Sequence, residues 1–220
     1  MRIFKVNNIF YSLQGEGRNT GRAAVFVRFA GCNLRCPFCD TDFEEFTMMT
    51  DEMILAEIQR LTSSIQTPLT SEGVGDKLLV VLTGGEPTLQ VDEAFVDLLH
   101  QHGYEVAMES NGTRPAPRNL DWLTVSPKDG GMWNGEGRMP DEIKIVFDEH
   151  TAEKLSSFHF PPTSFHLPPS TFHHPLLYLQ PCDTGDAARN IEIVAQCVEY
   201  IKAHPQWRLS LQTHKLIDIE

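Results

Sequence analysis

The chain has 220 residues, which is enough for one domain with a substantial core, and no stretch resembles a linker between two cores. Its 30 Asp and Glu outnumber its 18 Lys and Arg, and the formal charge of -12 argues against general affinity for nucleic acid or anionic membranes, so we expect a small-molecule substrate. The first residues lack the apolar run of a signal peptide, and no stretch reaches the length of a transmembrane helix, so we expect a cytoplasmic protein.

The segment 8–17 ends in a Gly-Glu-Gly turn, where glycines permit backbone conformations that other residues avoid. Two interpretations stay open here: an ordinary turn, or a turn whose backbone another group approaches closely. The following segment, 23–30, is apolar and β-branched at its centre, which predicts a strand that leads directly into a cysteine-rich loop. Arg28 interrupts this strand, and because a buried charge is costly unless paired, we expect it to meet an internal carboxylate or a substrate anion.

Three of the five cysteines, Cys32, Cys36 and Cys39, lie in this loop with the spacing CxxxCxxC. Three thiolates on one short loop can hold three irons of a cubane cluster, which leaves the fourth iron for an exogenous ligand. An odd, clustered set of cysteines also fits reduced thiols better than a disulfide framework. A structural zinc site usually needs a second pair of ligands, and Cys182 and Cys197 stand apart. A zinc site and a redox-sensing thiol cluster are the alternatives to an iron-sulfur cluster.

Downstream of the loop the pattern alternates between strands and helices. Short apolar runs predict strands at 77–83, 104–108, 122–125, 142–147, 176–179 and 207–211. Helical patterns predict helices at about 50–65, where the start offers a capping residue, at 92–102 and at 186–203. This makes six or seven strands and fewer helices. Because ligands bind at the carboxyl ends of strands in α/β folds, we expect the polar turns that follow the strands to converge.

The segment at about 156–175 does not fit this alternation. Phe-His-x-Pro-Pro occurs at 158–162 and 165–169, and a degraded copy starts at Phe172. Paired prolines exclude a coiled coil and favour an extended insertion on the surface. The histidines of the repeat are metal-ligand types, but regular spacing on such a loop is usually incidental, so we assign the repeat no catalytic role.

The CxxxCxxC loop, with an aromatic residue before its last cysteine and Gly-Gly-Glu-Pro at 84–87 after a later strand, resembles the radical S-adenosylmethionine (SAM) superfamily. The resemblance implies an α/β fold, an incomplete TIM-like barrel of the radical SAM type, over a single domain 1–220. It also implies that the three cysteines bind a 4Fe-4S cluster whose open iron is chelated by SAM, which is cleaved to methionine and a 5'-deoxyadenosyl radical. In that division of labour the cofactor carries the radical chemistry and the protein supplies position.

Further stretches resemble the 7-carboxy-7-deazaguanine synthase family, at 13–17, 31–41, 83–87, 124–128, 179–181 and 211–215. This resemblance implies a radical SAM lyase that converts 6-carboxy-5,6,7,8-tetrahydropterin to 7-carboxy-7-deazaguanine with release of ammonia, in queuosine and 7-deazapurine biosynthesis. It further implies a requirement for Mg2+, a flavodoxin- or ferredoxin-like reductant and a homodimer. The resemblance fails mainly at 48–75 and 150–175.

The same resemblance assigns roles to individual residues. A pterin is a flat ring with hydrogen-bonding edges and one carboxylate, and the residues implied to bind it are Leu13, Gln14, Gly15, Glu16, Arg28, Thr83, His214 and the terminal carboxylate of Glu220. Those implied to bind SAM are Phe38, Gly84, Gly85, Glu86, Ser110, Ser126, Pro127, Lys128 and Gln180, with the turn 84–86 receiving the methionine amino group. Thr41 matches the hydroxyl ligand of magnesium.

Two departures from the family pattern affect these assignments. The usual Glu-Thr-Ser-Gly-Thr turn is Glu-Ser-Asn-Gly-Thr at 109–113, and Gln180-Pro181 is followed by Cys182-Asp183-Thr184. We expect Cys182 to be a packing residue rather than a fourth cluster ligand.

Two other function classes compete with this prediction. Another radical SAM enzyme, such as a glycyl-radical activase, would share CxxxCxxC but would not account for 13–17 or 212–215, and would need a protein-docking surface. A non-enzymatic zinc or iron-sulfur module is the second alternative. The lyase accounts for the motifs at both ends of the chain.

Overall fold

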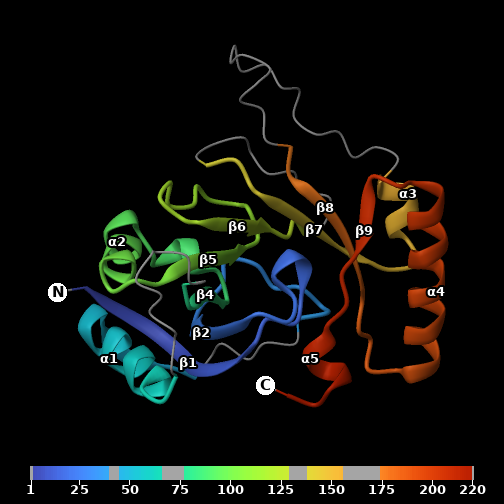
Figure 1. Cartoon of the computed structure of the whole chain (residues 1–220). Helices are drawn as coiled ribbons and strands as arrows, with labels where there is room; N and C mark the ends of the chain where they lie inside the picture. Colours follow the sequence, from blue (N-terminus) through green and yellow to red (C-terminus); the bar gives the residue numbers. More distant parts are fainter. Residues whose placement is uncertain (1, 40–44, 66–76, 129–137, 156–173, 220) are drawn as a thin grey trace, which may run out of the picture.

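The structure is a computed structural model that describes residues 2–39, 45–65, 77–128, 138–155 and 174–219. Its described strands form one sheet in the order β3-β1-β2-β4-β5-β6-β7-β8-β9 (Figure 1). Neighbouring strands from β2 through β4 to β9 pair in parallel, whereas β1 pairs antiparallel with β2 and β3. The bounds are β1 Ile3–Leu13, β2 Ala23–Phe29, β3 Thr47–Thr50, β4 Leu79–Gly84, β5 Glu105–Ser110, β6 Trp122–Val125, β7 Glu142–Phe147, β8 Leu176–Pro181 and β9 Trp207–Leu209.

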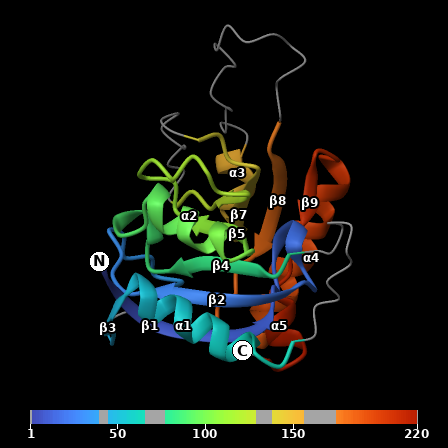
Figure 2. The ribbon, with the colours of Figure 1, turned by 60° about the vertical axis from the view of Figure 1, so that its left-hand side comes forward.

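Helices α1 to α4 cover one face of this sheet (Figures 1 and 2). Helix α1 packs on β1, α2 on β5, and α4 on β8 and β9. The longer helices begin where the sequence predicts, because Thr50, Asp92 and Asp186 each accept hydrogen bonds from backbone N–H groups of the first turn. The bounds are α1 Asp51–Thr62, α2 Glu93–Gln101, α3 Thr151–Leu155, α4 Ala187–Ala203 and α5 Thr213–Leu216, with short 3-10 helices η1 Gly17–Asn19 and η2 Pro87–Leu89.

Side chains alternate between the two faces of each strand, and this alternation divides the core from the site. On the helix side, Val27 of β2 and Leu82 of β4 belong to a large buried cluster that includes Ile58 of α1 and Phe95 of α2. A second cluster on the same side holds β8 and β9 against α4. On the opposite face, a small apolar cluster of Ala24, Leu79, Val81 and Ala107 packs at the start of the strands.

Farther along the same strands the residues of this opposite face become polar. Arg28 on β2, Thr83 on β4 and Glu109 on β5 each come one residue before the carboxyl end of their strand, and Lys144 lies in the middle of β7. The strand register places Arg28 directly beside Thr83. The polar turns therefore gather at one edge of the sheet, as the sequence predicts.

The sheet is open, because the order of its described strands has β3 at one end and β9 at the other. The prediction of an incomplete α/β barrel is confirmed, but six or seven strands is wrong, since β1 and β3 extend the sheet. Two asparagines and a register shift between Val6 and Asn8 interrupt the alternation of β1. Strand β3 has only four residues, none of them buried. Neither segment therefore shows a strand period that sequence inspection detects.

Most of the insertion predicted at about 156–175, including the Phe-His-x-Pro-Pro repeat, lies outside the described residues.

Candidate active site

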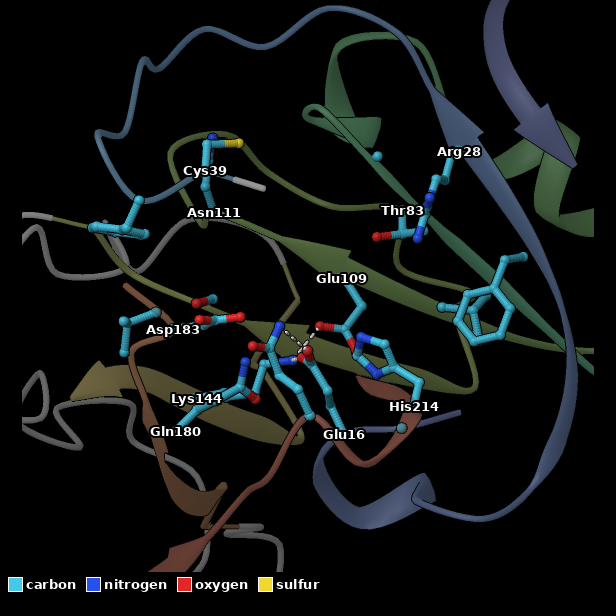
Figure 3. A pocket seen from close by; sticks show the side chains of 18 of the residues that line it. Glu16, Arg28, Cys39, Thr83, Glu109, Asn111, Lys144, Gln180, Asp183 and His214 are labelled. Atoms are coloured by element: carbon cyan, nitrogen blue, oxygen red, sulfur yellow. Dashed lines mark hydrogen bonds and ion pairs between the residues drawn. The ribbon is translucent and has the colours of Figure 1, made fainter. Parts of the chain in front are cut away.

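A cavity of about 510 Å³ lies at the carboxyl ends of the strands, which is a usual size for a small-molecule site (Figure 3). It is lined by residues from both ends of the chain and from the turns between them. The residues that the sequence assigned to a ligand and that line this cavity are Leu13, Gln14, Gly15, Glu16, Arg28, Cys32, Cys36, Phe38, Cys39, Thr83, Gly84, Gly85, Ser110, Ser126, Lys128, Gln180 and His214.

Four assigned residues stand apart from that set. Glu86 and Pro127 are buried and do not line the cavity. Thr41 and Glu220 lie outside the described residues. Ile219 does line the cavity, so the chain reaches the site one residue before Glu220.

The glycine turn at 84–85 packs directly against the start of the cysteine loop. Gly85 N donates to Phe29 O at 2.8 Å and Glu86 N donates to Gly31 O at 2.9 Å. A Cβ atom on Gly85 would lie 2.0 Å from Gly31 O, so only glycine permits this approach. The turn and the loop therefore form one wall of the cavity.

Glu86 joins the turns that follow β4 and β5. Its Oε1 accepts hydrogen bonds from the Thr88 backbone N–H at 3.0 Å, the Thr88 hydroxyl at 2.6 Å and the Ser110 hydroxyl at 2.9 Å. Its Oε2 accepts from Asn111 N at 2.7 Å. These donors engage both carboxylate oxygens of a fully buried side chain, so any ligand contact of Glu86 would come from its backbone.

Asn111, at one of the departures from the family pattern, holds the cysteine loop. Its side-chain amide donates to Asn33 Oδ1 at 3.0 Å and lies 3.9 Å from Cys32 Sγ. Asn33 in turn donates to Thr113 Oγ1 at 2.8 Å, and the Leu34 backbone N–H donates to Cys32 Sγ at 3.4 Å. The turn 109–113 thus supports the first cysteine through side chains.

A buried ion-pair network lies deeper in the cavity, and sequence inspection missed two of its three members. Lys144 Nζ pairs with Glu16 Oε2 and with Glu109 Oε2, the latter at 2.8 Å (Figure 3). Gln14 donates to Glu109 Oε1 at 3.2 Å, and Gln212 donates to Glu16 Oε1 at 3.2 Å. The signal in the sequence was a lysine inside an apolar strand, because such a charge needs a buried partner.

Burial and charge pairing oppose each other in this network. Burial acts to lower the pKa of Lys144, but the carboxylates of Glu109 and Glu16 outweigh it and raise this pKa above its ordinary value. Burial acts to raise the pKa of Glu16, and the Lys144 ammonium outweighs it, so the pKa of Glu16 is lowered. Glu142 lacks a comparable cation, and burial raises its pKa to about 7.

Two further cations line the cavity. The Arg28 guanidinium lies 4.8 Å from the centre of the Phe10 ring, and no carboxylate in the described part of the chain forms an ion pair with it. Of the two expectations for Arg28, a substrate anion is the one that stays open. Lys128 donates to Ser126 Oγ at 2.7 Å, and burial together with the nearby Lys144 lowers its pKa.

The segment after β9 crosses to the loop that follows β1. Thr213 donates to Gly15 O from its backbone N–H at 3.1 Å and from its hydroxyl at 2.9 Å. A Cβ atom on Gly15 would lie 2.2 Å from His214 Nδ1. The C-terminal segment therefore approaches the backbone of the Gly-Glu-Gly turn at 15–17 closely. Lys215 fastens the same segment to Asp183 Oδ2 at 2.9 Å.

None of the five cysteines, all in the described part of the chain, forms a disulfide. Cys182 is half-buried and lines the cavity, while Cys197 is on the buried side of α4, where burial raises its pKa to about 12. Among the described residues, no three His, Cys, Asp or Glu side chains are arranged to hold a single metal ion. A cubane cluster distributes three thiolate bonds over three irons, so its ligands need not converge on one point.

Comparison with known proteins agrees with this site. The radical SAM superfamily profile matches residues 26–126, which include the cysteine loop, the glycine turn and the strands β4 to β6. The fold is similar to a crystal structure of QueE from Escherichia coli, with a TM-score of 0.67 and 25% identity, over 95% of this chain and 93% of that one. The chain is thus a radical SAM protein with a partial barrel.

Curated relatives narrow the class to one family. The chain is 45% identical to 7-carboxy-7-deazaguanine synthase from Bacteroides thetaiotaomicron, over 98% of both chains. It is 41% identical to the protein of the same name from Bradyrhizobium diazoefficiens, over 98% of this chain and 99% of the relative. The chain belongs to the 7-carboxy-7-deazaguanine synthase family. In the described residues, no helix has the length and apolarity needed to cross a membrane.

Proposed function

We propose that this protein is a radical SAM lyase that converts 6-carboxy-5,6,7,8-tetrahydropterin to 7-carboxy-7-deazaguanine with release of ammonia, in queuosine and 7-deazapurine biosynthesis. One observation carries the proposal: a single cavity joins the three cysteines to the residues assigned to the pterin. The relatives that bear the synthase name match along nearly the whole chain, and the match therefore includes the segments near both chain ends that line this cavity.

The residues of the cavity fit a 4Fe-4S cluster and SAM, the cofactors of this superfamily. The three thiols face one cavity, and the glycine turn offers backbone groups beside them with no side chain in the way. When bound, the two cofactors supply the radical chemistry. On the SAM side, Ser126 and Gln180 offer hydrogen-bonding groups and Lys128 offers a cation.

The remaining wall suits a flat heterocycle with one carboxylate. Gln14 and Glu16 present amide and carboxylate groups, and Thr83 adds a hydroxyl. Arg28 presents a guanidinium, the side chain best shaped to bind a carboxylate by two parallel hydrogen bonds. These groups bind and orient the substrate, while the C-terminal segment at 213–219 limits access of water.

Magnesium is a further part of the proposal, with Thr41 as its protein ligand. Support comes from the motif, because Thr41 follows the last cysteine by only two residues in the sequence, and Mg2+ favours oxygen ligands such as a hydroxyl. Thr41→Ala is expected to lower turnover at limiting Mg2+ while leaving iron content unchanged. Loss of iron from this variant would mean that Thr41 supports the loop instead.

We also propose a single domain, a homodimer, a cytoplasmic location and a flavodoxin- or ferredoxin-like reductant. The described strands form one sheet, which supports the single domain. The thiols of the loop must stay reduced to bind iron, which favours the cytoplasm. Cys39 is exposed, which supports electron transfer to the cluster from a protein that docks on this loop.

Anaerobic turnover of the reconstituted protein with the carboxytetrahydropterin, SAM, Mg2+ and a chemical reductant tests the function. The expected products are 7-carboxy-7-deazaguanine and ammonia. Formation of 5'-deoxyadenosine without the deazaguanine would indicate a different radical substrate. Tight binding of about one zinc per chain, with no iron-sulfur absorption after reconstitution, would indicate the non-enzymatic module.

A further inference from the structure

Lys144 is a buried cation on β7 that contacts two acids from distant parts of the chain. It is 4% exposed, and its ammonium group lies between Glu16, on the loop after β1, and Glu109, at the end of β5. Gln14 and Gln212 donate to the carboxylate oxygens that do not contact Lys144, which are Oε1 of Glu109 and Oε1 of Glu16. Every carboxylate oxygen of the pair therefore has an internal donor (Figure 3).

Other charged groups around Lys144 do not replace it. Glu142, two residues earlier on β7, adds a third acid, and Lys128 and His214 face the same cavity from the loop after β6 and from α5. In a site of low dielectric, neighbouring carboxylates without a close cation cannot all stay ionised, and one of them takes up a proton.

A protonated carboxyl group would change what the cavity offers to a ligand. An ionised carboxylate only accepts hydrogen bonds, and each of its oxygens can accept a second one beside the internal donor. A carboxylic acid instead presents an O–H donor. A pterin ring offers N–H groups along its edge. Protonation of Glu16 or Glu109 would therefore place an O–H donor against an N–H donor of the substrate, and the hydrogen bond between them would be lost.

We propose that Lys144 is a positioning residue: it keeps Glu16 and Glu109 ionised and fixed in direction, so that the cavity presents acceptors to the N–H edge of the substrate. This inference rests on the proposed function, because it takes the pterin as the ligand. Lys144 acts through the two acids, which both line the cavity.

The first test compares Lys144→Met with wild type over roughly pH 6 to pH 9, the range above ordinary carboxyl pKa values. The quantity to follow is the KM of Lys144→Met for the pterin divided by the KM of wild type at the same pH. Titrations that occur equally in both proteins cancel in this ratio. At pH 7 the ratio is expected to be about tenfold to a hundredfold, the effect of losing a charge-assisted hydrogen bond. The ratio should fall as the pH rises, because Glu16 and Glu109 then lose the proton that one of them takes up when Lys144 is absent.

Two matched variants separate this role from a purely structural one. Lys144→Arg retains the cation and should recover part of the loss. In the double variant Lys144→Met, Glu109→Gln only one of the two acids is left and no second carboxylate repels its charge, so the KM ratio should depend on pH less steeply than in the single variant. A KM ratio that is large but independent of pH, and equal in the single and double variants, would overturn the proposal. If Lys144→Met does not fold, the Arg variant and the double variant still provide the comparison.

Infrared spectroscopy of the substrate-free protein tests the same claim without turnover. Lys144→Met should show one more protonated carboxyl group at pH 7 than wild type, and this signal should be smaller in the double variant. No additional protonated carboxyl in the single variant would also overturn the proposal. If wild type failed to convert the pterin while this signal appeared, the proposed function would be wrong but the effect of Lys144 on the two acids would hold.

Discussion

At the scale of single residues, the site depends on how each buried charge is compensated. Lys144 has two carboxylate partners, and Glu86 has four hydrogen-bond donors. Glu142 is different, because its recorded donor is the Arg18 backbone N–H at 3.0 Å and its side chain is 1% exposed. Burial without a paired cation favours the neutral acid. We therefore expect the ionisation of Glu142 to make the free energy of unfolding depend on pH.

We expect the protein to become less stable as the pH rises from about 4.5 to about 7 through Glu142. Its pKa is raised from 4.5 to about 7 in the folded state, so the folded chain binds the proton more tightly than the unfolded chain in this range. Stability from this group is complete below pH 4.5 and is lost by about pH 7, with a total on the order of 3 kcal/mol.

Denaturant unfolding of wild type and Glu142→Gln at pH 5 and pH 8 measures this effect. The Gln variant should show a smaller loss of unfolding free energy between the two pH values, because it cannot ionise. The exposed Glu93 on α2 provides the control, since Glu93→Gln should leave the difference as in wild type. Equal pH dependence in all three proteins would contradict the assignment.

At the scale of elements, the parallel strands bring three turns to one edge of the sheet, and backbone contacts then lock them together. The glycine turn after β4 bonds to the end of β2 and to the cysteine loop, and Glu86 bonds to the turn after β5. A change in one turn should therefore alter the cysteine loop, although the cysteines themselves are unchanged.

Gly85→Ala is expected to reduce cluster binding severalfold. The added Cβ would lie 2.0 Å from Gly31 O, so the loop must move away from the turn, at a stability cost of about 1–3 kcal/mol. Iron content and visible absorbance after reconstitution measure the result. Gly103→Ala is a stringent control: Gly103, unlike Gly85, has a positive φ, so alanine is strained there, but its Cβ position is open. Equal iron loss in both variants would indicate general instability instead.

The C-terminal segment is expected to serve the ligand rather than the core. Residues after Ser210 belong to none of the described buried clusters, but the segment contacts Gly15 and Asp183 and lines the cavity. A chain that ends at Ser210 should lose no more than about 1–2 kcal/mol of stability and retain its iron.

Pterin binding should weaken about tenfold or more in the same truncated chain, because the contacts of His214 and its neighbours are lost. Titration of the substrate into the reconstituted protein measures the affinity. Leu216→Ser, at a side chain that is 71% exposed on α5, should bind as wild type does. Unchanged affinity in the truncated chain would show that the segment has no part in binding.

At the scale of the whole molecule, helices α1 to α4 and both large buried clusters occupy one face of the sheet, and the site, with α5, occupies the other. The sheet stays open at β3 and β9. Strand β3 presents Met48, which is 53% exposed, at an edge whose backbone groups can pair with a second strand. This edge is the part of the described surface that we propose for the homodimer.

Met48→Lys is expected to shift the protein from dimer to monomer, because a charge on an edge strand opposes pairing with another chain. Sedimentation velocity over a range of protein concentrations measures the change. Ile191→Lys, at an exposed apolar residue of α4, should leave the dimer intact. A monomeric wild type would refute the homodimer, and a dimer disrupted only by Ile191→Lys would place the interface on α4.

Much of the architecture followed from local patterns. Helices α1, α2 and α4 begin where they were predicted to begin, and β6 and β7 have the predicted bounds, because capping and apolar runs act over a few residues. Strands β1 and β3, at one end of the sheet, were not predicted as strands. Their exposed faces carry polar residues without a clear period, and only pairing with each other and with β2 makes them strands.

The sequence by itself determined the class of chemistry: the spacing of Cys32, Cys36 and Cys39 left a zinc site and a thiol cluster as alternatives, and the resemblance of this loop and the glycine turn to the radical SAM superfamily favoured the iron-sulfur cluster. Only the tertiary structure decided that Lys144 meets Glu16 and Glu109, which lie 128 and 35 residues away along the chain. It also decided that the Glu86 carboxylate turns inward. Such pairings depend on the order and register of parallel strands, and local residue patterns do not encode them.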